Sequence, residues 1–196
     1  MSAAVTRDAA EPGWVAEVLR FWFEELGKSD WFAKDHHLDE RIRARFLPLY
    51  EKLAARDARD IRDAQEAATP RALLAAVIVL DQFSRNMFRD SARAYAADPI
   101  ARQLARTAVE QGFDRSMADE QRMFLYLPFE HSEERADQAL SVELVGRLGN
   151  DEWTRYAVAH QQIIDRFGRF PHRNAVLGRE STPAEVARLN EPMGKF

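Results

Sequence analysis

Three short segments of this chain are rich in arginine, histidine, carboxylate and amide side chains, groups that can bind anions and transfer protons. They lie at residues 81–86, 128–133 and 166–174 of the 196-residue sequence. Solvation alone does not require so specific a mixture. We therefore expect the three segments to meet in one polar site, although the sequence names neither a reaction nor a cofactor.

The first segment falls in a stretch predicted to be helical from residue 70 to about residue 88. At 100° per residue, Asp81 projects into the apolar face and Arg85 follows one turn later. Burying an unpaired charge costs free energy, so the position of this charged pair on an apolar face requires an explanation. Either it is a self-satisfied ion pair that tethers neighbouring loops, or Arg85 holds the carboxylate at the floor of a pocket. Gln82 and Asn86 are expected on other faces, where they cap adjoining backbone.

The second segment joins two predicted helices. Pro128 is expected to end the first, and the acidic residues that follow suit the start of the next. Glu133 nevertheless projects inward, and His131, just before the second helix, can act as an acid, a base or a ligand. The alternative is a cluster that only caps the helix.

A further histidine lies in the helix predicted over residues 151–167. His160 falls in the middle of its apolar face, a position typical of a packed, hydrogen-bonded core residue. Asp165 projects away from that face, so the two make a poor ligand pair. This geometry argues against a metal-hydrolase helix.

The third segment opens a long connection at residues 168–181, and long connections in compact domains often bind ligands. Gly168 suits the end of the preceding helix. Guanidinium groups bind carboxylate and phosphate through two parallel hydrogen bonds, which predicts an anion-binding loop. Alternatively, the arginines pair internally with Asp81, Glu133 or Glu143 and hold the loop. The polar residues concerned are Arg166, Arg169, His172, Arg173, Asn174 and Arg179.

Composition narrows the class of protein. The net charge of −4 argues against a general nucleic-acid-binding surface, and the absence of cysteine excludes disulfides, thiolate metal sites and thiol catalysis. No apolar run approaches the ~20 residues of a membrane span, and the first residues lack the apolar core of a secretory signal. Phosphate-loop, dinucleotide-binding, serine-hydrolase and zincin motifs are also missing. We expect a cytoplasmic protein without nucleic-acid or membrane partners.

The patterning is helical almost throughout. Apolar residues recur with helical spacing over residues 14–26 and 38–53, and strand signals are nearly absent. Thr69-Pro70 and Asp98-Pro99 predict helix starts, and Thr182 with Glu185 predicts a capping box. We expect an all-α fold, with residues 13–196 as one domain of antiparallel helix pairs and residues 1–12 as a disordered tail.

The three segments, with flanking Phe21-Trp22-Phe23 and residues 177–182, resemble the signature of a family known as domain of unknown function 924. The resemblance covers the chain from about Trp14. It implies a tetratricopeptide-like helical fold, although the tetratricopeptide consensus is not visible, and it implies no activity.

Two hypotheses follow. In the first, a polar pocket binds a small anionic ligand and performs acid–base or hydrolytic chemistry. His131 or His172 would transfer protons, and Glu133 or Asp81 would orient the imidazole. A variant places a divalent metal among His131, Glu133, His160 and His172. In the second, a non-enzymatic module presents a groove to a partner peptide, and the polar motifs are internal struts. The pocket residues would be Asp81, Arg85, His131, Glu133, His160, Arg166, Arg169, His172, Arg173 and Asn174.

Overall fold

A computed structural model describes residues 11–63 and 69–191, and within these ranges every regular element is helical, with no strand. The all-α prediction is therefore confirmed. The predicted tail at residues 1–12 lies almost entirely outside the described residues. No helix in the described part of the chain combines the length and apolar character that a membrane span requires.

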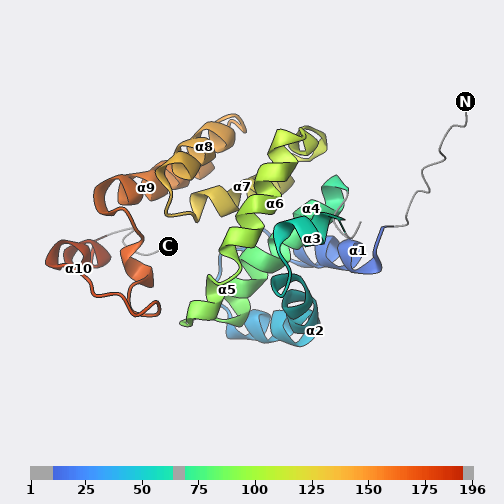
Figure 1. The fold of residues 1–196 in the computed structure, drawn as a ribbon, viewed down its shortest axis with the longest axis horizontal. Helices are drawn as coiled ribbons and strands as arrows, with labels where there is room; N and C mark the ends of the chain where they lie inside the picture. Colours follow the sequence, from blue (N-terminus) through green and yellow to red (C-terminus); the bar gives the residue numbers. More distant parts are fainter. Residues whose placement is uncertain (1–10, 64–68, 192–196) are drawn as a thin grey trace, which may run out of the picture.

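One continuous helical segment runs through the centre of the larger part of the molecule (Figure 1). It consists of α4 (Pro70–Val77), a π-helical segment (Ile78–Phe83) and α5 (Ser84–Met87). Every residue from 72 to 84 is buried, so this part of the segment has no solvent face. A helix surrounded by other helices is buried all round, which the projection onto one apolar face did not predict.

The surrounding helices supply the rest of the main core. Trp22 packs edge-on against Phe83 and Phe124, with ring centroids 5.5 and 5.4 Å apart. These helices are α1 (Gly13–Arg20) with a π-helical extension (Phe21–Glu25), α2 (His36–Ala54), α3 (Ala58–Asp63), α6 (Asp98–Glu110) and α7 (Asp119–Glu130).

The C-terminal elements form the other end of the molecule (Figure 1). Helix α8 (Arg135–Gly146) packs between α7 and α9 (Asp151–Phe167). The chain then returns toward the centre through a 3-10 turn (Pro171–Arg173) and ends in α10 (Pro183–Leu189). A small second core of Ile163, Ile164 and Phe170 lies here.

Several predicted helix ends are confirmed. The Thr69 hydroxyl accepts from the Ala72 amide, and Thr182 and Glu185 form the predicted capping box. Pro128 is the exception, because α7 continues through it to Glu130. Pro128 and its neighbour Phe129 are both buried, and this tertiary packing outweighs the hydrogen bond that proline cannot donate.

Candidate functional site

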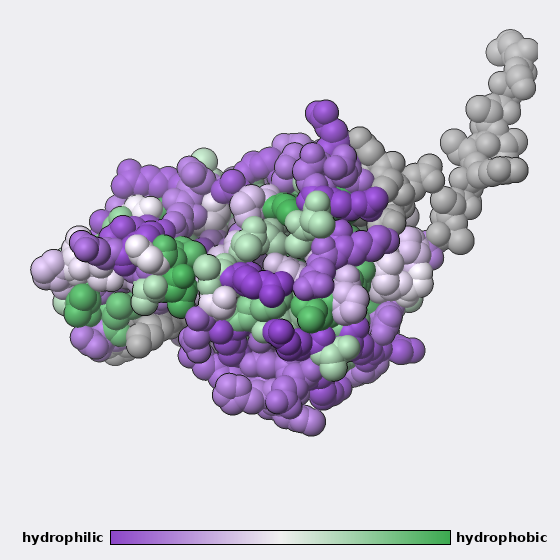
Figure 2. Space-filling model, turned by 60° about the horizontal axis from the view of Figure 1, so that its bottom comes forward, coloured by the Kyte–Doolittle hydropathy of each residue, from purple (hydrophilic) through white to green (hydrophobic). Residues whose placement is uncertain are grey.

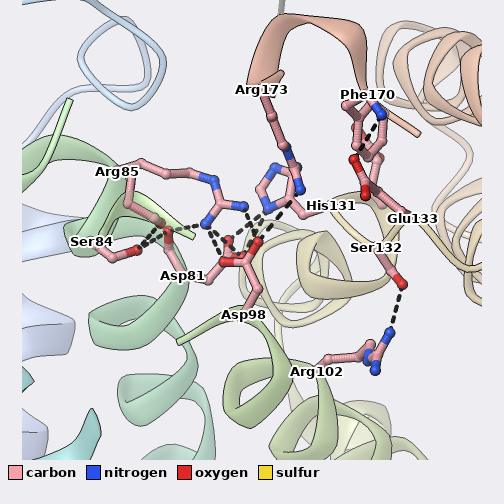
Figure 3. Close-up of polar contacts among 12 residues, drawn as sticks. Asp81, Ser84, Arg85, Asp98, Arg102, His131, Ser132, Glu133, Phe170 and Arg173 are labelled. Atoms are coloured by element: carbon pink, nitrogen blue, oxygen red, sulfur yellow. Dashed lines mark hydrogen bonds and ion pairs between the residues drawn. The ribbon is translucent and has the colours of Figure 1, made fainter. Parts of the chain in front are cut away.

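Five side chains, two arginines alternating with two aspartates and then a histidine, are linked from the C-terminal loop to the end of α7 (Figure 3). Arg173 Nη1 lies 3.7 Å from Asp98, and Asp98 receives two hydrogen bonds of 2.9 and 3.0 Å from Arg85. Arg85 also lies 3.1 Å from the carboxylate of Asp81, which contacts His131. Segments distant in the sequence thus share one electrostatic network.

Asp81 and His131 form a buried dyad. The His131 Nδ1 lies 2.9 and 3.0 Å from the two oxygens of Asp81, a residue with no exposed surface. Burial opposes ionisation of Asp81, but the charge of Arg85, with the contact to His131 and the hydrogen bond from Gln82, outweighs it and holds the pKa of this carboxyl well below its ordinary value. An ionised Asp81 can only accept, so His131 donates through Nδ1–H and its Nε2 is the basic nitrogen.

The carboxylate of Asp81 is held on further sides by its own helix. Gln82 donates to it at 2.6 Å, and Arg85 donates to the Asp81 backbone oxygen at 2.7 Å. Gln82 therefore serves the dyad and not adjoining backbone, contrary to expectation. The π-helical turn at Ile78–Phe83 changes the spacing of side chains here, and such turns are frequent at functional sites. Burial lowers the pKa of His131, with Arg85 adding to the effect, so the imidazole is neutral.

Glu130 and His160 form a second buried pair beside the first. Glu130 Oε1 lies 3.0 Å from His160 Nδ1, which also contacts the Tyr156 carbonyl at 2.9 Å. Burial, with the charge of Asp81 adding to it, raises the pKa of Glu130 to about 8. Burial lowers the pKa of His160 to about 3. The His160 ring centre is 6.3 Å from that of His131, so the two pairs adjoin.

Arg173 is the cation of the network with the fewest polar contacts. Arg173 is 6% exposed. Its guanidinium lies 4.6 Å from the ring centre of Tyr95 and 4.4 Å from that of Phe170. Burial lowers its pKa to about 10, assisted by the charge of Arg85. Among the described residues its buried Nε has no hydrogen-bond partner.

Two neighbours of Arg173 in the same loop also have unpaired buried atoms. Within the described ranges, neither His172 Nδ1 nor Asn174 Oδ1 has a hydrogen-bond partner. Burial, with the Arg173 charge adding to it, lowers the pKa of His172 to about 3. Asn174 Nδ2 donates to the Ser181 hydroxyl at 3.0 Å, which holds the loop. Buried polar atoms usually have partners, so three consecutive residues of this loop depart from the usual pattern.

Other predicted site residues lie in structural contacts. Glu133, expected to orient an imidazole, accepts two hydrogen bonds from Arg179 at 2.8 and 3.0 Å and one from the Phe170 amide at 2.8 Å. Arg169 forms a two-hydrogen-bond pair with Glu185 of α10, at 2.6 and 2.9 Å. Arg166 is exposed, with its guanidinium over the Phe167 ring. Internal ion pairs therefore account for Arg169 and Arg179, and Arg166 lies on the surface.

The metal variant receives no geometric support. Within residues 11–63 and 69–191, no group of three or more histidine, aspartate or glutamate side chains is arranged to hold a metal ion. Glu133 points to Arg179, and the other three residues of that variant are histidines.

Three members of the site have no recognisable signal in the sequence. Glu130 precedes His131, and its inward direction depends on α7 continuing past Pro128. The position of Asp98 at a helix start is sufficient to explain it, and no pattern singles out Tyr95. Their roles follow from contacts with Arg85 and Arg173, between segments that only the fold brings together.

With this geometry established, comparison with known proteins identifies the family. The model of a family described as bacterial protein of unknown function (DUF924) matches residues 18–193. The chain belongs to this family. A solved structure of a protein of unknown function from Agrobacterium tumefaciens is similar at 39% identity, with a TM-score of 0.82, over 91% of this chain and 97% of that one. No curated protein matches the chain. Membership in the DUF924 family thus gives the fold and leaves the activity to be argued from the site.

Proposed function

We propose that this protein binds a small anionic ligand beside Arg173 and that His131, held by Asp81, exchanges a proton with it. The observation that carries the proposal is Arg173 itself, a buried guanidinium that, among the described residues, has an unpaired Nε and one long ionic contact, to Asp98 at 3.7 Å. A buried charge normally has close partners, because leaving water is costly. A bound anion would supply the missing partner.

The dyad supports acid–base or hydrolytic chemistry on that ligand. Asp81 fixes the ring of His131 through Nδ1, which leaves Nε2 to accept a proton. The same arrangement of carboxylate and imidazole prepares a general base in many enzymes. Arg85 and Arg173 would stabilise negative charge that develops during reaction. His172 is the second candidate for proton transfer.

The proposed setting is the cytoplasm, with no nucleic-acid partner. The absence of cysteine fits a reducing compartment, and the net charge of −4 does not favour polyanionic partners.

The alternative is a tetratricopeptide-like scaffold that binds a partner peptide. Two observations favour it: the struts of Glu133 with Arg179 and Arg169 with Glu185, and apolar surface at the C-terminal end. On the face in Figure 2, apolar side chains gather toward the end that carries α10. Val186 of α10 and Leu177 of the loop before it are 49% and 37% exposed.

A thermal-shift screen against carboxylates, phosphates, nucleotides and divalent metals tests the proposal. A ligand at ~100 times its dissociation constant should stabilise the native protein by about 2.7 kcal/mol, which raises the melting temperature clearly. The stabilisation should fall to about half, ~1.4 kcal/mol, in Arg173→Lys at the same ligand concentration. It should be unchanged in Arg166→Lys, since Arg166 lies in the same segment but is exposed. A hit with the same shift in Arg173→Lys, or a flat screen, would favour the scaffold.

A further inference from the structure

The surroundings of Arg173 restrict how a ligand can approach it. Tyr95 and Phe170 lie against the guanidinium, at 4.6 and 4.4 Å from its central carbon, so stacking is already satisfied. Asp98 lies at Nη1, at 3.7 Å. The Nε belongs to the opposite edge, and among the described residues it has no partner. A ligand can therefore complete the hydrogen bonding of Arg173 through the Nε edge.

The charges around His131 limit the charge of that ligand. Its ionisable neighbours are Asp81 and Arg85 from the central segment, Asp98 from α6, His160 from α9 and His172 from the loop. Glu130 precedes it in the chain, and Arg173 is linked to it through Asp98, Arg85 and Asp81. The two guanidiniums balance the carboxylates of Asp81 and Asp98. Glu130 carries its proton at neutral pH, because burial raises its pKa to about 8.

An added monoanion would make this buried network negative unless a proton enters with it, since uncompensated charge is costly away from water. His131 is the suitable acceptor, because its Nδ1 is already committed to Asp81 and its Nε2 is basic. A phosphate dianion would need two such protons. A carboxylate also has the planar pair of oxygens that matches two parallel guanidinium N–H groups.

From this geometry we propose that the ligand is a small monocarboxylate, bound side-on at the Nε edge of Arg173 and taken up with one proton on His131. The inference rests on the proposed function and deepens it by naming the ligand class and the charge it carries. No covalent step is involved, and the proton comes from solvent.

The test is an NMR titration of the whole protein with acetate, and separately with inorganic phosphate, that follows the side-chain Nε resonance of Arg173. Assignment through side-chain correlations in the unsubstituted protein makes the readout independent of any variant. Acetate should move the Arg173 resonance and leave that of Arg166 unchanged. Its dissociation constant should rise about tenfold in Arg173→Lys, which keeps the charge but loses the Nε edge.

Proton uptake is read from the same titration at several pH values. Because one proton enters with each acetate, the dissociation constant should rise by up to tenfold per pH unit above the pKa of free His131. His131→Asn retains a side-chain N–H for Asp81 but has no titratable ring. In that variant the pH dependence should vanish while the Arg173 shift persists.

The failures are distinguishable. If phosphate moves the Arg173 resonance and acetate does not, the carboxylate assignment is overturned and the anion site stands. If acetate binds with the same affinity at every pH, the coupled proton is overturned. If neither anion moves Arg173, both this inference and the proposed function fall.

Discussion

The imidazole of His131 and the carboxylate of Asp81 lie 50 positions apart in the sequence, yet the His131 Nδ1 is 2.9 and 3.0 Å from the two Asp81 oxygens. Asp81 comes from the fully buried π-helical turn of the central segment, and His131 follows the last residue of α7. This contact joins two of the three polar segments. The third reaches it through Arg173, Asp98 and Arg85.

Replacing Asp81 with asparagine should destabilise the protein by about 3 kcal/mol, because Arg85 and His131 both lose a charged, fully buried acceptor. Urea denaturation at neutral pH measures the change. Asp165→Asn is the matched control, since Asp165 is exposed, and it should stay within about 0.5 kcal/mol. Equal effects of the two substitutions would show that Asp81 is not a buried ionic centre.

Glu130→Gln should change how stability depends on pH. The pKa of Glu130 is about 8 in the folded protein against an ordinary 4.5, so the folded state binds its proton more tightly. The stability that the protonated carboxyl contributes is complete below about pH 4.5 and is lost as the pH rises toward 8. The loss is at most ~1.4 kcal/mol per pH unit.

Denaturation curves between pH 5 and pH 8 should therefore show the Glu130→Gln variant gaining stability relative to the unsubstituted protein as the pH rises. Glu134→Gln is a control on an exposed neighbour. Parallel pH profiles for the unsubstituted protein and Glu130→Gln would contradict the assignment of a protonated Glu130.

The opposite sign applies to His160. Its pKa is lowered to about 3 by burial, from an ordinary 6.5, so the unfolded chain binds a proton that the folded protein rejects. The stability contributed by the neutral imidazole is complete above about pH 6.5 and is lost as the pH falls toward 3. His160→Gln should reduce the acid-induced fall by up to ~1.4 kcal/mol per pH unit. His36→Gln, at an exposed position, should leave the dependence of stability on pH unchanged. If the two substitutions changed that dependence equally, His160 would not be the buried imidazole that resists protonation.

Arg169→Ala should loosen α10 and leave the binding site intact. The guanidinium joins Glu185 of α10 through two hydrogen bonds and also donates to the Glu180 carbonyl at 2.8 Å. Amide hydrogen exchange in α10 should become faster, because the helix loses its tether to the loop. Arg166→Ala, which removes an exposed guanidinium, is the control. If Arg169→Ala abolished acetate binding without faster amide exchange in α10, Arg169 would be a ligand-binding residue and not a tether of α10.

The sequence predicted the elements well where the signals are local. The helix at Asp151–Phe167 has the predicted bounds, with Gly168 at a φ of 69° beyond its end. Thr69 and Thr182 cap the predicted helix starts. Periodicity and capping act within a few residues, so they can be recognised without the rest of the fold. The end of α7 was mispredicted at Pro128, because burial of that turn is a property of the tertiary packing.

Local patterns predict the all-α class, most helix positions and the three segments that supply the polar groups. The pairing of these groups is a property of the tertiary structure: His131 with Asp81, His160 with Glu130, and Arg173 with the rings of Tyr95 and Phe170. The tertiary structure also assigned Glu133 and Arg169 to struts. Ionic pairing and burial depend on distances between elements remote in the chain, and local sequence patterns do not encode those distances.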